Sequence, residues 1–405
     1  MGLVGVLVTG LWLDARGLDA RGARGAPAEG ARLERMQSSP QWRAQGEHFG
    51  NVRERVDGSA WEMTKGWFFG GSDHTAPREA LPVLQRSASD FEKAPPSGLR
   101  VTWLGHSILF VEIDGRRFLV DPVFGERASP FTFLGPKRWY ASPLSPEDLP
   151  ELDAILISHD HYDHLDLTAV EKLSPRGLRW IVPLGVGAHL EAWGVPPDLV
   201  TELDWWQTTT VEDATITATP ARHFSGRWLD DQNRTLWAGF AIRGARHNVY
   251  YSGDTALFDE LVDIGQRLGP FDLTIIEAGA YDALWSDVHL GPEQAVRAHR
   301  LVRGDLLLPV HWGLFDLALH GWTEPLERVF RAAEREGVRF VTPRPGESIE
   351  PATARAPTRW WPEVPWTPAE RHPVQSSGVA HLTTPELPPA ARPVLPVRQV
   401  NDCGE

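Results

Sequence analysis

The sequence predicts a layered α/β protein built on one mixed β-sheet or on two sheets. Hairpin-like pairs of short β-rich runs come first in the chain, and alternating strand-like and helix-like segments follow them. At 405 residues, with 42% apolar and 23% charged side chains, the chain has the length and composition of a globular protein with a full core.

The hairpin region lies at residues 99–122, where LRVTWLG, ILFVEID and RRFLVDP are short runs rich in strand-forming residues. Asp114 and Gly115 separate the second run from the third, and this dipeptide is typical of a tight hairpin turn. Further apolar runs typical of strands follow at residues 152–158, 214–220, 236–243, 247–253, 271–279 and 305–313.

Helical patterns fall between these runs. The segment 291–303 has Pro292 near its start and apolar residues at helical spacing. The other helices are expected at residues 164–173, 184–193, 255–268 and 323–336.

The two ends of the chain differ from this central region. Residues 1–37 combine an apolar stretch with a Gly/Ala/Arg-rich linker, and residues 351–405 are Pro-rich and are predicted to form an extended or disordered tail. We therefore expect one folded domain at 38–350. The apolar stretch at 2–13 is too short for an ordinary transmembrane helix and follows no basic residue, so it is at most a weak anchor or signal. The expected location is cytoplasmic or peripheral to a membrane.

Charge and cysteine content exclude some functions. The net charge is −14, from 40 basic and 54 acidic residues, which disfavours nonspecific binding of polyanions such as nucleic acid. Cys403 is the only cysteine, so the chain cannot form an internal disulfide and its body offers no thiolate ligand.

The strongest functional signal is HDHYDH at residues 159–164, directly after an apolar strand-like run. Side chains at the carboxyl ends of buried strands commonly form sites in α/β proteins. His159 and His161 can point to one position, and Asp163 and His164 to a second position nearby. Imidazole and carboxylate are ligands for zinc, iron and manganese. A solvated polar loop is the alternative, and the density of histidine makes it the weaker one.

Three later residues can complete a metal site. His223, Asp254 and His311 each follow a strand-like run. A lone histidine in such a position is more often structural, but the shared placement of these three residues favours a common site. Together with HDHYDH they offer enough ligands for two metals that share a bridging carboxylate.

With these residues assembled, the chain resembles a known superfamily. HDHYDH fits the H-x-H-x-D-H signature of the metallo-β-lactamase fold, and His223, Asp254 and His311 come in the order that this superfamily uses. The stretches WLGHSILFVEIDGRRFLVDPVF, RASPFTFLGPKRW, GPFDLTIIEAGAY, HLGPEQAVRAH and PVHWGLFDLALH together look like the N-acylphosphatidylethanolamine-hydrolysing phospholipase D group. The resemblance covers about residues 38–349.

The resemblance implies an αββα sandwich with the metal site at one edge of the sheets. It also implies two Zn²⁺ per chain, with iron or manganese as alternatives, and a metal-bridging hydroxide that attacks phosphorus. In the implied ligand set His159, His161 and His223 hold one ion, Asp163, His164 and His311 hold the other, and Asp254 bridges them. Asp163 and Asp254 are thus also expected to take part in catalysis.

Five further positions accompany these ligands. His289 matches a functional histidine of the group and is expected to contact the phosphoryl oxygen or assist the leaving group, with helix capping or packing as the alternative. His106 and Asp121 are expected to orient ligands. Asp160 and Tyr162 are expected to point away from the ions or to support the ligands.

The expected function is a di-zinc phosphodiesterase acting on N-acylphosphatidylethanolamine-like lipids. A lactonase or soluble phosphodiesterase with the same site, and a non-catalytic metal-binding scaffold, are the alternatives, whereas the acidic balance argues against a nuclease. The expected partner is a phospholipid or another phosphodiester and no nucleic acid. A peripheral membrane contact and a homodimer are both compatible with the sequence. Trp228, Trp285, Trp312 and Phe315 are expected either to line an acyl-chain groove or to pack in the core.

Overall fold

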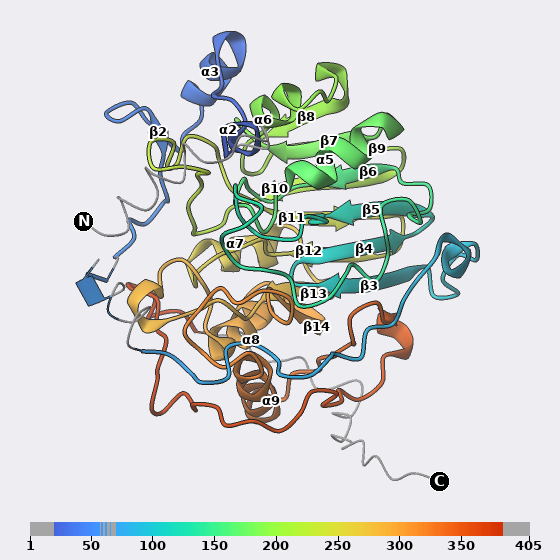
Figure 1. Cartoon of the computed structure of the whole chain (residues 1–405), viewed down its shortest axis with the longest axis vertical. Coiled ribbons are helices and arrows are strands. Elements are labelled where there is room, and N and C mark those ends of the chain that lie inside the picture. Colours follow the sequence, from blue (N-terminus) through green and yellow to red (C-terminus); the bar gives the residue numbers. More distant parts are fainter. Residues whose placement is uncertain (1–19, 57, 60, 63–64, 66–69, 384–405) are drawn as a thin grey trace.

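The computed structural model describes residues 20–56, 58, 59, 61, 62, 65 and 70–383, and in these residues two β-sheets are packed between outer helices (Figure 1). The seven-stranded sheet has the order β15-β3-β4-β5-β6-β7-β8, and the six-stranded sheet has the order β14-β13-β12-β11-β10-β9. The expected αββα sandwich is confirmed.

The strand bounds follow the predicted runs closely in most cases. The first sheet contains β3 (Leu99–Gly105), β4 (Ile108–Ile113), β5 (Arg116–Val120), β6 (Ala154–Leu156), β7 (Arg179–Pro183), β8 (Val200–Leu203) and β15 (Ser348–Ile349). The second sheet contains β9 (Thr208–Val211), β10 (Ala214–Thr219), β11 (Gly239–Arg243), β12 (Asn248–Tyr251), β13 (Phe271–Glu277) and β14 (Gly304–Val310). The expected turn at Asp114 and Gly115 joins β4 to β5, and both residues have positive φ angles.

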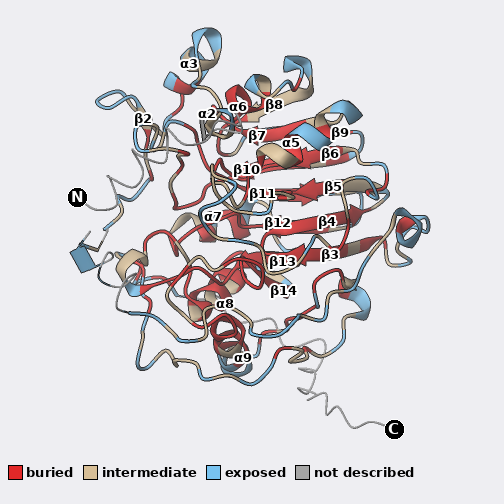
Figure 2. Cartoon of the chain, in the orientation of Figure 1, coloured by how far each residue is buried: buried red, intermediate tan, exposed pale blue. Residues whose placement is uncertain are grey.

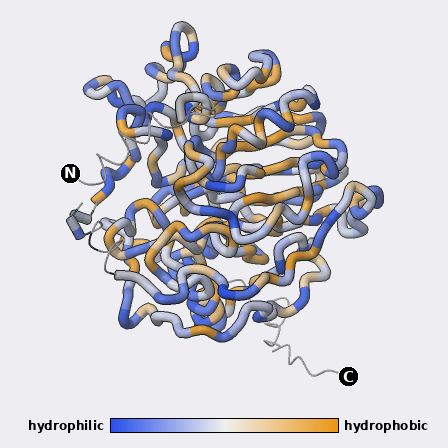
Figure 3. Tube along the Cα trace, viewed as in Figure 1, coloured by the Kyte–Doolittle hydropathy of each residue, from blue (hydrophilic) through white to orange (hydrophobic). Residues whose placement is uncertain are grey.

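Alternation along β4 shows how the layers form. Leu109 and Val111 face the core cluster shared with the six-stranded sheet, whereas Ile108 and Phe110 pack on the opposite side with Val170. Because successive side chains of a strand point to opposite faces, a strand between two layers needs apolar residues at both parities. The strands are accordingly buried in Figure 2 and mostly apolar in Figure 3.

All five predicted helices are present with somewhat shorter bounds. The helices α5 (Leu167–Leu173) and α6 (Gly187–Ala192) cover the seven-stranded sheet, and α7 (Glu260–Arg267), α8 (Pro292–Leu301) and α9 (Glu324–Glu336) lie on the side of the six-stranded sheet. Asp166 caps α5 by accepting bonds from the backbone N–H groups of Thr168 and Ala169. This cap begins the helix directly after HDHYDH and fixes the direction in which the chain leaves that loop.

Four strands of the two large sheets were not predicted from the sequence. β8, β9 and β15 are short and only partly buried, and β9 (Thr-Thr-Thr-Val) carries almost no apolar signal. β7 is buried, but it is a short run that ends at Pro183 and is followed closely by a helix. Edge strands with polar residues are held by backbone pairing with their neighbours, which leaves little trace in a hydrophobicity pattern.

The two ends are more ordered than expected, as far as they are described. The linker region holds α2 (Ala20–Arg24) and α3 (Gly30–Gln37), and the short strands β1 (Trp42–Arg43) and β2 (His48–Phe49) follow. The prediction of a disordered tail from residue 351 needs correction for 351–383, because this segment is extended and packed, with Trp361, Val374 and Val379 buried. Residues 2–13 and 384–405 lie outside the described residues. No helix in the described part of the chain is long and apolar enough to cross a bilayer.

Candidate metal centre

The candidate site lies where strands of both sheets end. β12, β13 and β14 are parallel neighbours, so Asp254, Glu277 and His311 emerge at the same edge of the six-stranded sheet. In the other sheet β5 and β6 are also parallel, and Asp121 and the HDHYDH loop follow them. The sequence signal of polar residues at strand ends thus corresponds to one place in the molecule.

Two backbone hydrogen bonds join the sheets at this edge. The N–H of His311 donates to the carbonyl of His106 at 3.1 Å, and the N–H of His106 donates to the carbonyl of Trp312 at 3.1 Å. His106, Asp121 and His311 all have positive φ angles, of 53°, 43° and 66°. A left-handed backbone costs a non-glycine residue roughly 1–3 kcal/mol and is concentrated at functional sites. Three such residues here mark this edge as a site whose geometry the fold enforces.

The first group of candidate ligands surrounds one point. His159 Nε2 lies 2.9 Å from His161 Nδ1, which lies 3.3 Å from His223 Nε2. Asp254 Oδ2 is 3.7 Å from His159 Nε2 and 3.8 Å from His223 Nε2. Ring nitrogens this close, with one carboxylate oxygen facing them, form a ready cation site.

The second group lies on the other side of the same Asp254 oxygen. Asp254 Oδ2 is 3.1 Å from His164 Nε2 and 2.9 Å from His311 Nε2. Asp163 Oδ2 is 3.5 Å from His164 Nε2 and 3.4 Å from His311 Nε2. The structure therefore brings together all seven residues that the sequence proposed as ligands, with Asp254 between the two groups.

Hydrogen bonds on the outer nitrogens aim the histidines inward. Asp121 Oδ2 accepts from His164 Nδ1 at 2.7 Å, and the carbonyl of Val288 accepts from His223 Nδ1 at 2.9 Å. Ser158 Oγ accepts from His159 Nδ1 at 3.0 Å. A ring whose Nδ1–H is engaged presents the Nε2 lone pair to the site, which is the form a metal requires.

The polar atoms that face the interior fit a bound metal. Asp254 Oδ1 is buried and has no hydrogen-bond partner among the described residues, and the buried Nε2 atoms of His164 and His311 face only carboxylate oxygens of Asp163 and Asp254. An unsatisfied buried polar group costs about 1–3 kcal/mol, so such atoms are rare unless an ion or water meets them. The donor set of imidazole and carboxylate suits zinc, iron or manganese.

The buried carboxylates and imidazoles of the site offset the effect of burial on each other's pKa values. Burial alone would raise the pKa of Asp163 and Asp254, but the adjacent imidazoles hold both pKa values well below the usual range. Burial likewise acts to lower the pKa of His311, yet Asp254 and Asp163 raise this pKa to about 10. Metal ions would replace the protons that these carboxylates otherwise stabilise on the imidazoles, so metal binding here is linked to proton release.

Comparison with known proteins agrees with the fold. Residues 116–312 match the beta-lactamase superfamily domain. The N-acyl-phosphatidylethanolamine-hydrolyzing phospholipase D 1 of Caenorhabditis elegans is 39% identical over 297 residues, which cover 69% of this chain and 83% of that protein. The chain belongs to the same family as this relative, within the beta-lactamase superfamily. It is therefore a metal-dependent hydrolase.

Two further relatives extend the comparison. An uncharacterized protein of Mycobacterium tuberculosis is 44% identical over 313 residues, or 76% of this chain and 82% of that protein. Among solved structures, the isothiocyanate hydrolase from Delia radicum gut bacteria aligns with a TM-score of 0.50 and 20% identity, covering 62% of this chain and 98% of that one. The second likeness supports the shared fold of the family.

His289 lies beside the two ligand groups. Its ring centroid is 5.1 Å from those of His223 and His311, and its Nδ1 lies 2.7 Å from Glu277 Oε2. Its side chain is 14% exposed, whereas that of Glu277 is fully buried. His289 thus lies beside the candidate ligands, and its Nδ1 contacts the carboxylate of Glu277.

Glu277 was not singled out from the sequence, although its signal was present. It ends the apolar run of β13 just as Asp254 and His311 follow β12 and β14. Acidic residues at strand ends are common, however, and the pattern alone does not distinguish a residue that bonds a histidine from one that faces solvent.

His106 lies among the candidate ligands and contacts one of them directly. Its Nε2 is 3.0 Å from Asp163 Oδ2, and its ligand atom belongs to the same close group as those of Asp163, His164 and His311. Burial, followed by the charge of His311, lowers the pKa of His106 to about 3, so its imidazole is neutral. A neutral His106 donates to Asp163 and holds that carboxylate in place.

Asp160 and Tyr162 bond to groups outside the two candidate ligand groups, as expected. Asp160 accepts from Gly226 N and Thr235 Oγ1, both at 2.7 Å, and Tyr162 donates its hydroxyl to the carbonyl of Arg227 at 2.8 Å. Both residues therefore fix the loop that carries the candidate ligands to the chain after β10.

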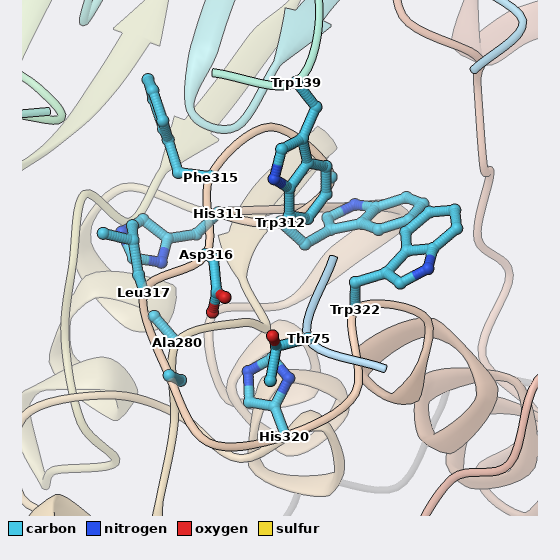
Figure 4. A pocket seen from close by; sticks show the side chains of 12 residues that line it. Thr75, Trp139, Ala280, His311, Trp312, Phe315, Asp316, Leu317, His320 and Trp322 are labelled. Atoms are coloured by element: carbon cyan, nitrogen blue, oxygen red, sulfur yellow. The ribbon is translucent and has the colours of Figure 1, made fainter. Parts of the chain in front are cut away.

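A small cavity lies next to His311. It measures about 20 Å³, room for roughly one water, and Figure 4 shows Trp312, Phe315 and the carboxylate of Asp316 at its walls. Trp312 and Phe315 are buried, with Trp312 stacked on Trp103 at 5.3 Å, so core packing is the better description of both. An acyl chain does not fit in a space of this size.

Proposed function

We propose that the protein is a phosphodiesterase of phospholipase D type that uses two zinc ions and cleaves N-acylphosphatidylethanolamine-like phospholipids. The observation that carries the proposal is the position of Asp254, whose Oδ2 lies within 3.8 Å of a nitrogen of each of four histidines. A shared carboxylate suits a pair of ions, and paired ions are used for in-line displacement at phosphorus. The relative from Caenorhabditis elegans supports the choice of lipid.

In a two-ion site, the candidate ligands of this chain would direct the lone pairs of their ring nitrogens and carboxylate oxygens toward the ions. His159, His161 and His223 would hold one ion, Asp163, His164 and His311 the other, and Asp254 both. When bound, the ions supply an acidified water and stabilisation of charge on the phosphoryl oxygens. Asp121, Ser158 and the Val288 carbonyl keep the imidazoles in the orientation that this chemistry requires.

His289 is the candidate for proton transfer. Cleavage of phospholipase D type releases an alcohol, whose leaving oxygen needs a proton as the P–O bond breaks. His289 is partly exposed and stands beside both ligand groups without belonging to the seven. It can therefore face a substrate that reaches the ions from solvent.

Exposed apolar side chains support a lipid substrate. Two loops near the site carry Phe133, Leu134 and Leu229, which are 58%, 49% and 85% exposed. Phe131 and Trp228 join these loops, with ring centroids 6.1 Å apart. We call these five residues the apolar rim. It adjoins the HDHYDH loop, because Tyr162 bonds to the residue before Trp228, and it offers a surface that can enter the boundary of a lipid layer.

A substrate panel tests the proposal. Purified protein with measured metal content is assayed against N-acylphosphatidylethanolamine, a soluble phosphodiester and a lactone. We expect release of an N-acylethanolamine and phosphatidic acid, about two zinc ions per chain, and a large loss of turnover in Asp254→Asn. Asp272→Asn is the matched control, since Asp272 lies on β13 and bonds Asn248 N away from the ligands.

The alternatives give different results in the same panel. Hydrolysis of the lactone without cleavage of the lipid would establish a lactonase. Cleavage of the soluble phosphodiester alone would establish a phosphodiesterase of another substrate class. Metal binding without turnover of any ester would leave a metal-binding scaffold.

A further inference from the structure

We propose that Glu277 is a positioning residue that fixes the tautomer and direction of His289, so that the Nε2 lone pair faces the substrate. The inference rests on the proposed role of His289 in proton transfer. It adds a carboxylate–histidine pair to the two candidate metal groups. The relevant observations are the burial of Glu277 and the identity of each atom that contacts its two oxygens.

Each oxygen of Glu277 has a separate task. Oε1 accepts from the backbone N–H of Thr255 at 2.5 Å and from that of Leu290 at 3.3 Å. Oε2 lies 2.7 Å from His289 Nδ1. Thr255 follows Asp254 and Leu290 follows His289, so one carboxylate ties the loop of a candidate metal ligand to the segment that carries the histidine.

These contacts determine which nitrogen of His289 carries the proton. Backbone N–H groups only donate, so they engage Oε1 as an acceptor. Burial raises the pKa of Glu277, while the contact with His289 acts to lower it. In its ionised form the carboxylate only accepts, so His289 Nδ1 donates to Oε2. The neutral imidazole then has its lone pair on Nε2, on the side of the ring away from Glu277. Nε2 can take up a proton and later give it to a leaving oxygen.

The segment around His289 is held independently of this contact. Ser377 donates from N and Oγ to the two oxygens of Asp287, at 2.7 and 2.6 Å, and Ser376 Oγ donates to the carbonyl of Ser286 at 2.7 Å. The packed segment 351–383 therefore fixes the backbone just before His289. Removal of the Glu277 charge should change the imidazole more than it changes the course of the chain.

A third metal position is the competing interpretation of this carboxylate. The ligand atoms of Asp254, Glu277, His289 and His311 lie within 4.8 Å of one another. However, both oxygens of Glu277 already accept hydrogen bonds, and Oε2 is 2.7 Å from His289 Nδ1 but 3.9 Å from His311 Nδ1. A fully buried carboxylate with this set of donors is better suited to orient a histidine than to bind a cation.

Glu277→Gln is the decisive variant because it is isosteric. The amide oxygen should replace Oε1, since the two backbone donors cannot change, and the amide NH₂ then faces His289 Nδ1. This Nδ1 must become an acceptor, which moves the proton to Nε2. The analogous change in a Ser-His-Asp triad keeps the geometry and lowers kcat about 10⁴-fold. Because bound ions would also stabilise the transition state, we expect a smaller loss of kcat here, roughly 10²-fold.

The experiment combines turnover with a readout that needs no substrate. Protein with ¹⁵N-labelled histidine should show, by NMR, His289 protonated at Nδ1 in the wild type and at Nε2 in Glu277→Gln, at equal zinc content. Turnover of the best substrate of the panel should fall in Glu277→Gln and in His289→Ala, and the double variant should be no worse than His289→Ala. Asp272→Asn should match the wild type.

Three results would overturn the inference. An unchanged His289 tautomer in Glu277→Gln is one, and loss of zinc in parallel with turnover is another, because it would make Glu277 a ligand or a scaffold residue. Additive losses in the double variant are the third. The NMR measurement stands even if the lipid is not the substrate, so failure of this inference and failure of the proposed function are distinguishable.

Discussion

Asp121→Asn should weaken metal binding while the fold persists. Asp121 is fully buried, and its Oδ1 accepts from Ser158 N at 2.7 Å. Its Oδ2 accepts from Ser158 Oγ at 2.6 Å, His164 Nδ1 at 2.7 Å and Tyr251 Oη at 2.5 Å. Four donors thus converge on one carboxylate, and an amide cannot accept from all of them.

Either orientation of the new amide has a cost. If NH₂ replaces Oδ2, His164 Nδ1 must accept and its Nε2 carries a proton, which blocks the metal. If NH₂ replaces Oδ1, it opposes the Ser158 N–H and leaves a buried donor unpaired, at about 1–3 kcal/mol. Loss of such a partner of a ligating histidine typically lowers metal affinity about 10- to 100-fold, or about 1.4–2.7 kcal/mol.

Competition with a chromophoric chelator measures the change in zinc affinity. Asp204→Asn is the matched control, because Asp204 is a buried carboxylate just after β8 that accepts from the backbone N–H of Trp205, away from the candidate ligands. It should lower the melting temperature and leave zinc affinity unchanged. Equal zinc affinity in Asp121→Asn and the wild type would refute the role of Asp121 in orienting His164.

Three other outcomes are expected. Chelation of the metals should lower the melting temperature, since free zinc at 1,000 times Kd contributes about 4 kcal/mol to the free energy of unfolding; equal melting curves with and without metal would contradict the site. Burial lowers the pKa of His299 to about 3, and the charge of Arg300 adds to this effect. As pH falls, His299 is therefore protonated in the unfolded chain before it is protonated in the folded chain, and the free energy of unfolding decreases from about pH 6.5 toward pH 3. The loss in the free energy of unfolding is about 2–3 kcal/mol by pH 4.5. In denaturant titrations, the free energy of unfolding of His299→Leu should fall less steeply with decreasing pH than that of the wild type; an equal pH dependence would contradict this role of His299. The double variant Phe133→Ser/Leu229→Ser should bind phospholipid vesicles several-fold less in sedimentation and keep its turnover of a soluble ester, whereas unchanged vesicle binding would remove the apolar rim from lipid contact.

Much of the fold was predictable because both faces of the central strands are buried. β3, β10 and β13 were expected within one residue or two of their observed bounds, since their apolar runs are continuous and end at turn residues. The edge strands β9 and β15 were not, because backbone pairing holds them and their side chains contribute little. The packing of segment 351–383 was missed for a related reason: Pro-rich composition suggested disorder, but buried side chains such as Trp361 and Val374 anchor it.

The candidate site also has residues that were predicted from the sequence and one that was not. HDHYDH, His223, Asp254 and His311 were found because imidazole and carboxylate stand at strand ends, which the topology brings to one edge. Glu277 carries a similar signal, but its partner His289 depends on a contact between β13 and the segment before α8. That contact is a product of tertiary packing, and only the structure shows which atoms face each other.

The division of the candidate ligands between two sheets has a consequence for biosynthesis. HDHYDH leaves the seven-stranded sheet, and His311 belongs to the six-stranded sheet 152 residues later (311 − 159). Closing a chain of this length costs about 4–5 kcal/mol in entropy. During synthesis, the histidines of HDHYDH also leave the ribosome long before His311 is made. An ion bound at that stage can contact only some of the candidate ligands. Stable metal uptake should wait for the docking of the two sheets, which makes metal content a report on completed folding.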